Sequence, residues 1–551
     1  MIKFRTKTNI AILTGLGILW SGSAAAAPAI EEPPYAAREQ AGQTAGETSI
    51  ENDLPPATYG RDTASFKLRA LSVVQEEGMT IRQESLDRIA SSYIGRTVTL
   101  ADLNRAAAEI TTYCRAHGYP AATAYLPPQE TASGSIRISV APGRYGNISI
   151  DNRSRILKTS VIERLTHGLK QGDVIEGRKL ETVLYNIIGL GGVKAGGMLR
   201  PGKSPGESDV VILVQDGKQE TYVLYANNYG SKPAGRYRYG FTADWYEMGG
   251  NGEHIGVNGM LSNKDQKNFG ISYDQEVGRS GTRLGLGYSY ANYELGARLA
   301  ALGAKGTAAT VSLFGSTPLY RTTNSGLAFT YGVDYRDMTD EISNFDIRTD
   351  KNSYAAHVGL NGFQKAGRTL YAYDIKGYAG HLSGDTKITG LDALPMEQQG
   401  GYAKGTLDAS IVHTFNPRLD IFFKASAQLA GRDLDSSEEI YLGGASGVRA
   451  YPQGEGSGDS GYLATAELRY HTAVPGLTLS TYFDIGHVNA RGDNADLRST
   501  TLQGWGIGLT WTRTNDFFAR LDYARRIGLG KNVSQDADAT GRIWFMLGKV
   551  W

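Results

Sequence analysis

The stretch Arg283-Leu-Gly-Leu-Gly-Tyr-Ser-Tyr290 alternates between two kinds of side chain. Leucine or tyrosine stands at every second position, and glycine or serine stands between them. A period of two places successive side chains on opposite faces of a β-strand. The stretch therefore predicts a strand with one large apolar face and one small or polar face.

The same alternation recurs from about residue 218 to Trp551. Gly504–Trp511 alternates large apolar residues with glycine and threonine, whereas Tyr462–Tyr470 and Phe517–Arg525 carry ions on the second face. A soluble β-sandwich also has one apolar face per strand, so alternation alone leaves that fold open. Aromatic residues at the ends of the apolar face and ions on the other favour an outer-membrane β-barrel with a wet interior. At about 20 residues per strand and connection, residues 218–551 predict a transmembrane antiparallel barrel of roughly 16 strands, with a lumen wider than side chains fill.

Composition agrees with a barrel and excludes other classes. The chain has 70 glycines and 32 tyrosines but a single cysteine, which suits short strands with aromatic belts. No segment after the N-terminus has the run of about 18 apolar residues that a spanning helix needs, so a helical membrane protein is excluded. The formal net charge is +1 without a basic block, so nucleic acid is not an expected partner. Cys114 cannot form an internal disulfide and is expected on the buried face of a helix.

The first 27 residues have the parts of a secretory signal peptide. Lys3, Arg5 and Lys7 precede the apolar run 10–20, and small residues follow up to Ala27. The run is too short to cross about 30 Å of hydrocarbon, so we expect cleavage near residues 25–27 and export from the cytoplasm. Residues 28–65 are rich in Pro, Ala, Glu and Thr, and we expect a linker with one weak helix candidate at 35–44.

Between this linker and the barrel, a β-α-α-β-β order occurs twice, at residues 66–142 and 143–217. A repeated supersecondary unit indicates two similar small domains in series. Thr99 is a good N-cap with Asp102 at the N3 position, and Gly118 is a helix stop. We expect strands at 66–74, 121–126 and 135–140 and helices at 85–93 and from Thr99 to Gly118, followed in the second unit by strands at 147–150, 193–199 and 209–214 and helices at 160–169 and 177–190.

Three local motifs stand out in the barrel region. The strand 478–488 contains Phe483-Asp-Ile-Gly486, and alternation directs Phe483 toward lipid and Asp484 toward the lumen. An ion in a barrel wall needs a partner. The other two motifs are the first hairpin, 227–238, with Asn228, Gly230, Gly235 and Arg236, and the Gly-rich stretch Gly443-Gly-Ala-Ser-Gly-Val-Arg-Ala-Tyr-Pro452, with Val448, Arg449 and Tyr451.

These features resemble a known family over residues 66–551. The two small units look like polypeptide-transport-associated (POTRA) domains, and the whole arrangement resembles the B components of two-partner secretion, the haemolysin and haemagglutinin secretion/activation family. The stretch around Arg449 resembles the family's Val-Arg-Gly-Tyr motif, at the tip of a long loop folded back into the barrel. The resemblance implies that Arg449 pairs with Asp484. Ala450 replaces the motif's glycine, which puts in doubt any conformation with a positive φ there.

The last strand resembles the recognition signal of outer-membrane barrels. Ile543, Phe545, Leu547 and the terminal Trp551 share one face, and Lys549 interrupts that apolar row. A lysine near the membrane interface can extend its amine to water. We therefore expect Phe545 and Trp551 to act as an assembly signal, with outer-membrane lipid and the barrel assembly machinery as partners.

The leading functional hypothesis is an outer-membrane pore whose POTRA domains bind a large secreted exoprotein in the periplasm by adding a client strand to a sheet edge. The client would then pass outward through the lumen. An assembly factor that inserts other barrels shares this plan, although two POTRA units favour secretion. A passive solute porin would leave the periplasmic residues idle. An enzyme is disfavoured because the eight histidines lack metal-ligand spacing and no G-x-S-x-G motif occurs, so catalytic residues, metal and cofactor are not expected.

Overall fold

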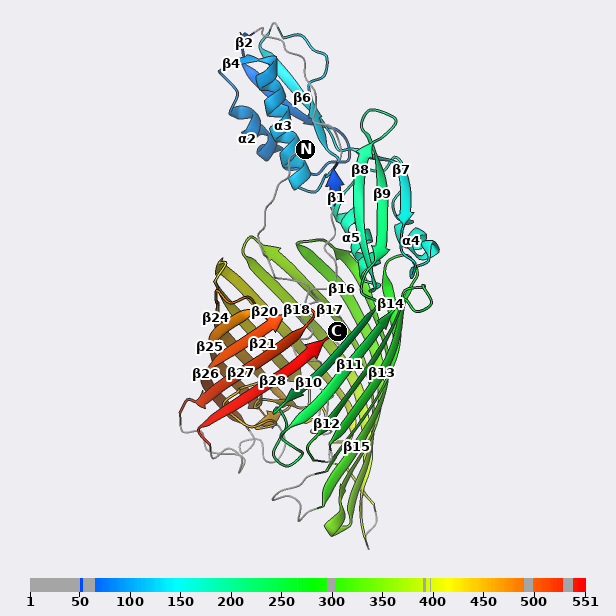
Figure 1. Cartoon of the computed structure of the whole chain (residues 1–551), viewed down its shortest axis with the longest axis vertical. Coiled ribbons are helices and arrows are strands. Elements are labelled where there is room, and N and C mark those ends of the chain that lie inside the picture. The colour runs from blue at the N-terminus through cyan, green and yellow to red at the C-terminus, as the bar shows by residue number, and fades with distance from the viewer. Residues whose placement is uncertain are drawn as a thin grey trace.

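The computed structural model describes residues 50–52, 65–131, 133–264, 266–294, 303–389, 393–396, 398–489, 499–528 and 539–551. The expected signal peptide and the helix candidate at 35–44 lie outside these residues. Within the described part, two small α/β units stand in series on one end of a closed β-barrel (Figure 1). The described residues include no helix with the length and apolarity to cross a bilayer.

The first unit has the expected elements with two corrections, because the first strand is divided and an additional short strand, β4 (Thr97–Thr99), lies between the helices. The predicted single strand at 66–74 is wrong, because the chain changes sheets at Leu68, which is buried and donates its backbone N–H to the Arg96 carbonyl at 2.9 Å. The helix predicted after Thr99 is confirmed as α3, with a capping box between Thr99 and Asp102. The elements are β2 (Ser65–Lys67), β3 (Ala70–Gln75), α2 (Gln83–Ser91), β4 (Thr97–Thr99), α3 (Leu100–Ala116), β5 (Thr123–Tyr125) and β6 (Ser135–Ala141), with β2 pairing with β4 and β3 lying parallel to β6.

The second unit packs two helices on a four-stranded sheet of order β1-β8-β9-β7. The outer strand β1 (Ile50–Asn52) comes from the stretch expected to be a linker, and it lies parallel to β8 with Ile50 opposite Gly197. Ile50 packs against the core of the unit, which explains why this short segment is held. The other elements are β7 (Arg144–Asn152), α4 (Thr159–Thr166), α5 (Gly177–Ile188), β8 (Val193–Pro201) and β9 (Glu207–Asp216).

The barrel closes with sixteen long antiparallel strands, as the period-two pattern predicts. The exposed side chains of Leu284, Leu286, Tyr288 and Tyr290 confirm the outward face of the first quoted stretch. The strands are β10 (Glu220–Asn227), β11 (Arg238–Tyr246), β12 (Glu253–Ser262), β13 (Lys267–Val277), β14 (Thr282–Glu294), β15 (Ala304–Arg321), β16 (Ser325–Ile342), β17 (Ile347–Ala366), β18 (Thr369–Ile388), β20 (Gly400–Asn416), β21 (Leu419–Ala430), β24 (Ser460–His471), β25 (Leu477–Asn489), β26 (Thr500–Arg513), β27 (Phe517–Arg526) and β28 (Gly541–Val550), with the two-residue β19 (Leu394–Pro395) beside β18.

The second α/β unit contacts the turns at one end of the barrel, which we call the proximal end. In α5, the Thr182 hydroxyl accepts the backbone N–H of Arg321 at 3.0 Å, and the Asn186 amide donates to the Ser280 carbonyl at 3.0 Å. Helix α4 adds an ion pair between Arg164 and Glu276 of β13. These contacts fix the unit over the turns that precede β14 and β16, and leave the long connections at the distal end.

Candidate functional site in the barrel lumen

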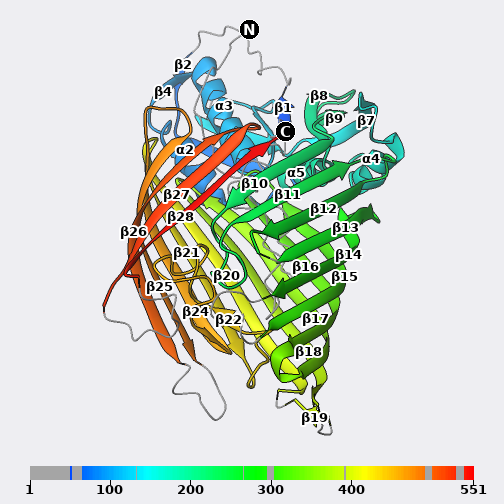
Figure 2. The same ribbon diagram turned by 60° about the horizontal axis from the view of Figure 1, so that its bottom comes forward.

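The connection between β21 and β24 is a distal loop that folds back inside the barrel. Residues 431–459 contain a short antiparallel pair, β22 (Ile440–Tyr441) with β23 (Ser457–Gly458). Figure 2, in which the distal end comes forward, shows β22 within the ring of strands. The loop tip is buried: Val448, Ala450 and Tyr451 form an apolar cluster with Tyr482 and other inward side chains of the wall.

Arg449, at this tip, reaches Asp484 of β25. Its Nε donates to Asp484 Oδ2 at 2.9 Å and its Nη2 donates to Oδ1 at 2.7 Å, while the backbone N–H of Arg449 donates to Oδ2 at 3.1 Å. The Thr465 hydroxyl donates a fourth hydrogen bond to Oδ1 at 3.0 Å. Arg449 is 5% exposed and Asp484 is 1% exposed, so water competes little for these bonds. This is a bidentate, charge-assisted contact between loop and wall.

Two further carboxylates lie on the same side of the lumen. Arg449 Nη1 is 3.3 Å from Glu467 Oε2 of β24 and 3.4 Å from Asp522 Oδ1 of β27. The face of the guanidinium lies over the Tyr482 ring, 3.1 Å from its centroid. Finally, Trp544 Nε1 of β28 donates to the Arg449 carbonyl at 2.6 Å. The tip is thus attached to four strands of the wall, and we call these contacts the tip lock.

Small residues in the wall make room for the loop. Ala450 has no positive φ, so the alanine in place of the motif's glycine is compatible with this backbone. Its methyl group faces Gly504 of β26, where a Cβ would lie 2.5 Å from the Ala450 Cβ. At Gly486, a Cβ would lie 2.9 Å from Leu442 Cδ2 of the loop. The Gly of the Phe483-Asp-Ile-Gly486 motif therefore serves loop packing.

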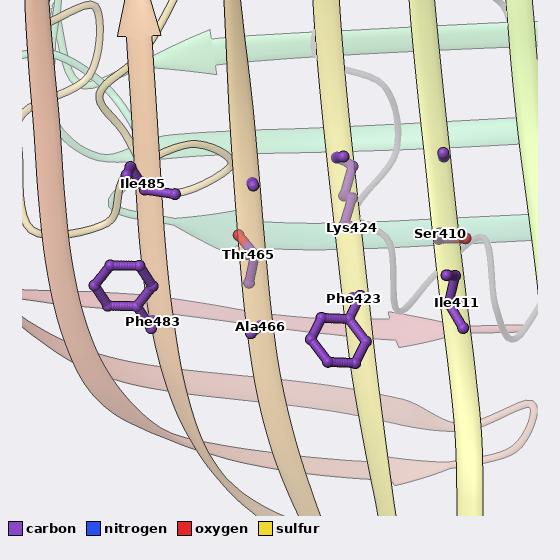
Figure 3. A pocket seen from close by; sticks show the side chains of 11 residues that line it. Ser410, Ile411, Phe423, Lys424, Thr465, Ala466, Phe483 and Ile485 are labelled. Atoms are coloured by element: carbon purple, nitrogen blue, oxygen red, sulfur yellow. The ribbon is translucent and has the colours of Figure 1, made fainter.

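The outer side of this wall is apolar, as alternation predicts. Phe483 and Ile485 project away from the lumen and line a shallow depression of about 250 Å³ together with Phe423 and Ile411 (Figure 3). Thr465 and Lys424 lie on the other side of the same strands. Asp484 therefore stands between two outward-facing residues and points inward.

The first hairpin and the last strand, which are the two other predicted sites, meet where β10 pairs with β28 and closes the barrel. The ladder between β10 and β28 joins five residue pairs, against twenty between β17 and β18, so it needs added contacts. Asn228 supplies them: its Nδ2 donates to the Ile543 carbonyl at 2.9 Å and its Oδ1 accepts the Phe545 N–H at 2.8 Å. At the proximal end, the backbone groups of Trp551 and Tyr222 bond to each other at 2.9 and 3.2 Å.

The remaining residues of the first hairpin shape its turn. The Gly230 N–H donates to the Arg236 carbonyl at 3.0 Å, and Gly235 has a φ of 103°. A Cβ on Gly230 would lie 1.8 Å from the Gly235 carbonyl oxygen, so the close approach requires glycine. Lys549, which interrupts the apolar row of β28, pairs with Asp516 of the proximal turn at 3.0 Å.

Sequence reasoning identified Arg449 and Asp484 but missed Glu467, Asp522 and Trp544 as part of the same cluster. Period-two alternation places each of them on the inner face, yet it does not give the register of β24 to β28 that brings these side chains to the loop tip. No group of three or more His, Cys, Asp or Glu side chains within the described ranges could hold a metal ion.

Comparison with known proteins agrees with this architecture. Residues 206–511 match the family model "Haemolysin secretion/activation protein ShlB/FhaC/HecB", and residues 70–143 match the ShlB-type POTRA domain. The chain is 26% identical to the heme/hemopexin transporter protein HuxB of Haemophilus influenzae over 510 residues, which cover 90% of this chain and 89% of that protein.

Similarity extends to a second group of transporters. The outer membrane transporter CdiB of Dickeya dadantii is 21% identical over 443 residues, covering 78% of this chain and 77% of that one. The solved structure of CdiB from Escherichia coli superposes with a TM-score of 0.69 at 19% identity, covering 92% of this chain and 95% of that chain, and so shares the fold. The chain belongs to the ShlB/FhaC/HecB family of haemolysin secretion/activation proteins, and it is an outer-membrane transporter of two-partner secretion with its POTRA domains in the periplasm.

Proposed function

We propose that this transporter recognises a large exoprotein of the haemolysin or adhesin type through its POTRA domains and passes it through the barrel lumen to the cell surface. The observation that carries the proposal is the distal loop, which lies inside the barrel and is fastened there by ion pairs at its tip. The tip contacts run through side chains and leave the strand-to-strand pairing of the wall untouched, so the loop can leave the lumen without breaking the barrel wall. It is suited to be a removable lid.

Recognition by strand addition is supported by β1. This segment already adds a parallel strand to the β8 edge of the second POTRA domain and covers Gly197 to Leu199, three of the nine residues of β8. Backbone hydrogen bonds supply affinity in this mode, and alternate side-chain positions supply selectivity. A client strand with an apolar residue in the place of Ile50 would fit the same edge.

The proposed pore performs no chemical reaction on its client. No nucleotide is available in the periplasm, so the driving force is attributed to client folding outside the cell. The outward apolar rows contact outer-membrane lipid, and the strand that carries Phe545 and Trp551 is the proposed signal for the barrel assembly machinery. No observation on the described residues favours the alternative of an assembly factor for other barrels.

Photo-crosslinking in cells tests the recognition step. A photoreactive residue is placed at Met198, opposite Glu51 of β1, and a matched one at Asp151 in β7 on the other edge of the same sheet. The client to be tested is whichever large exported protein the neighbouring reading frames encode. Crosslinks at Met198 with none at Asp151 are expected. Secretion of the client without a crosslink at Met198 would contradict recognition at this edge.

A further inference from the structure

The first half of the distal loop carries an acidic segment, Asp433-Leu-Asp-Ser-Ser-Glu-Glu439. Asp435 is 8% exposed and Glu438 is 3% exposed, although both belong to a polar loop. Buried carboxylates require cations or several hydrogen-bond donors nearby. Their partners therefore define how this half of the loop is held.

Glu438 is bound by two cations of the barrel wall. Arg336 Nη1 lies 3.0 Å from Glu438 Oε1, and Lys404 Nζ lies 2.8 Å from Oε2. Lys404 also donates to the Glu438 backbone carbonyl at 3.0 Å, and the Gln428 side chain donates to the same oxygen at 2.8 Å. Both the carboxylate and the backbone at this position are therefore fixed to the wall.

Asp435 makes the same kind of contact with β17, the neighbour of β16. Lys351 Nζ lies 3.2 Å from Asp435 Oδ2 and 2.8 Å from Asp340 of the wall itself. Asp435 Oδ1 also accepts the Ser437 backbone N–H at 3.0 Å, which shapes the turn between the two acids. We call the contacts of Asp435 and Glu438 with Arg336, Lys351 and Lys404 the stem latch.

The stem latch and the tip lock are separate in place and opposite in charge. Arg336, Lys351 and Lys404 come from β16, β17 and β20, whereas the tip lock uses β24, β25, β27 and β28. At the stem the loop supplies anions to cations of the wall. At the tip it supplies a cation to carboxylates of the wall, of which Glu467 and Asp522 also pair with Arg520. The two sets share no residue, so loss of one leaves the charges of the other paired.

We propose that the stem latch holds the first half of the distal loop in the lumen independently of Arg449, so that the loop opens in two steps. The three wall cations are each less than 10% exposed. Departure of the acidic segment would leave Arg336 and Lys404 without the carboxylate they share, which opposes spontaneous release. Release of the tip alone moves the segment around Arg449 and leaves the stem in place.

Ser437 offers a probe of the stem. It lies between the two acids, is fully buried, and its hydroxyl makes no hydrogen bond in the structure, so Ser437→Cys is a conservative change. The native Cys114 lies in the first POTRA domain, where burial raises the pKa of its thiol to about 11, so it contributes little background labelling. Labelling of intact cells with a membrane-impermeant maleimide then reports exposure of the stem, and it requires no client.

Four full-length variants carry Ser437→Cys: the otherwise unchanged chain, Arg449→Ala, the pair Asp435→Asn with Glu438→Gln, and Asp337→Asn. Asp337 is exposed on the outer face of β16, next to Arg336, and controls for loss of a carboxylate. Rates are normalised to the amount of folded barrel. The stem latch predicts labelling at least about tenfold faster in the acid-pair variant, and within about twofold of the parent in Arg449→Ala and Asp337→Asn.

Two results would overturn the proposal. Equal acceleration by Arg449→Ala would mean that the loop opens as one body, and unchanged labelling of the acid-pair variant would mean that the ion pairs do not hold the stem. If the acid-pair variant fails to reach the membrane, Arg336→Met with Lys404→Met removes the two ion pairs of Glu438 from the wall side and should also accelerate labelling. Because no client takes part, failure here is distinct from failure of the proposed secretion role.

Discussion

Arg449→Ala should release the loop tip more strongly than Asp484→Ala. The arginine change removes two bonds to Asp484, at 2.9 and 2.7 Å, and leaves that buried carboxylate without its cation, whereas Glu467 and Asp522 keep Arg520. Breaking a buried ion pair from one side costs about 3–5 kcal/mol. The backbone N–H of residue 449 and the Thr465 hydroxyl still contact Asp484, which favours the lower end of that range.

Asp484→Ala is the milder change because Arg449 still has two other carboxylates nearby. In Asp484→Ala, Arg449 still lies 3.3 Å from Glu467 and 3.4 Å from Asp522. We expect a cost of about 1.5 kcal/mol, comparable to one hydrogen bond to a charged group. The population of open loop should therefore rise about tenfold in Asp484→Ala and more than roughly a hundredfold in Arg449→Ala.

Thermolysin cleavage before Val448, a bond that is the same in every variant, measures this population in the purified full-length protein, provided that the loop opens and closes faster than it is cut. Arg525→Ala is the matched control, since it removes an exposed, outward arginine of the same wall. Cleavage of the control should equal that of the parent. A larger effect of Asp484→Ala than of Arg449→Ala, or no effect of either, would refute the reasoning.

Three other expectations follow from the structure. Asn228→Ala removes two side-chain hydrogen bonds across the barrel closure, at a cost of about 1–3 kcal/mol, and should lower the temperature at which the barrel loses its compact migration in an SDS gel; an unchanged temperature would contradict the role of Asn228. Residues 66–216 should fold cooperatively without the barrel. The N–H and hydroxyl of Thr99 hold the pKa of Asp102 below its usual value, so the stabilisation by Asp102 should be present above pH about 4 and disappear as pH falls further. Thermal melts of this fragment that are insensitive to both Asp102→Ala and acid pH would count against this role of Asp102. Deletion of residues 28–60 should leave barrel assembly intact, as judged by the amount of protein in outer membranes, while planar-bilayer conductance tests whether the segment restricts the lumen.

The barrel could be predicted because its sequence pattern depends only on residues that are close together in the chain. Alternation at Leu284, Leu286 and Tyr288 fixes which face meets lipid, and this requires no knowledge of the neighbouring strand. The capping box of Thr99 and Asp102 is equally local, since both partners lie within one helical turn. By contrast, the strand predicted at 66–74 divides at Leu68, because its first part pairs with β4 and its second part with β6.

In the candidate site, only the residues that lie within the recognised motifs were predicted. Arg449 and Asp484 could be paired by resemblance, whereas the contacts of Glu467 and Asp522 depend on the register of β24 to β27 and on how far the loop folds back. The acidic segment around Glu438 has the composition of an ordinary solvated loop, and its burial results from cations on β16, β17 and β20. Similarly, Ile50 occurs in a stretch with little apolar content, and it is held by a sheet edge roughly 150 residues away.

The central claim is that the client crosses the membrane through the lumen, and a stalled client tests it most directly. The candidate client, fused to a tightly folded domain so that it stops during export, is combined with a photoreactive residue at Thr330 or at Val333. Both lie on β16, with Thr330 buried on the inner face and Val333 exposed on the outer face. Crosslinks to the stalled client from Thr330 and none from Val333 are the predicted result. A stalled client that crosslinks at Val333 but not at Thr330 would contradict passage through the lumen.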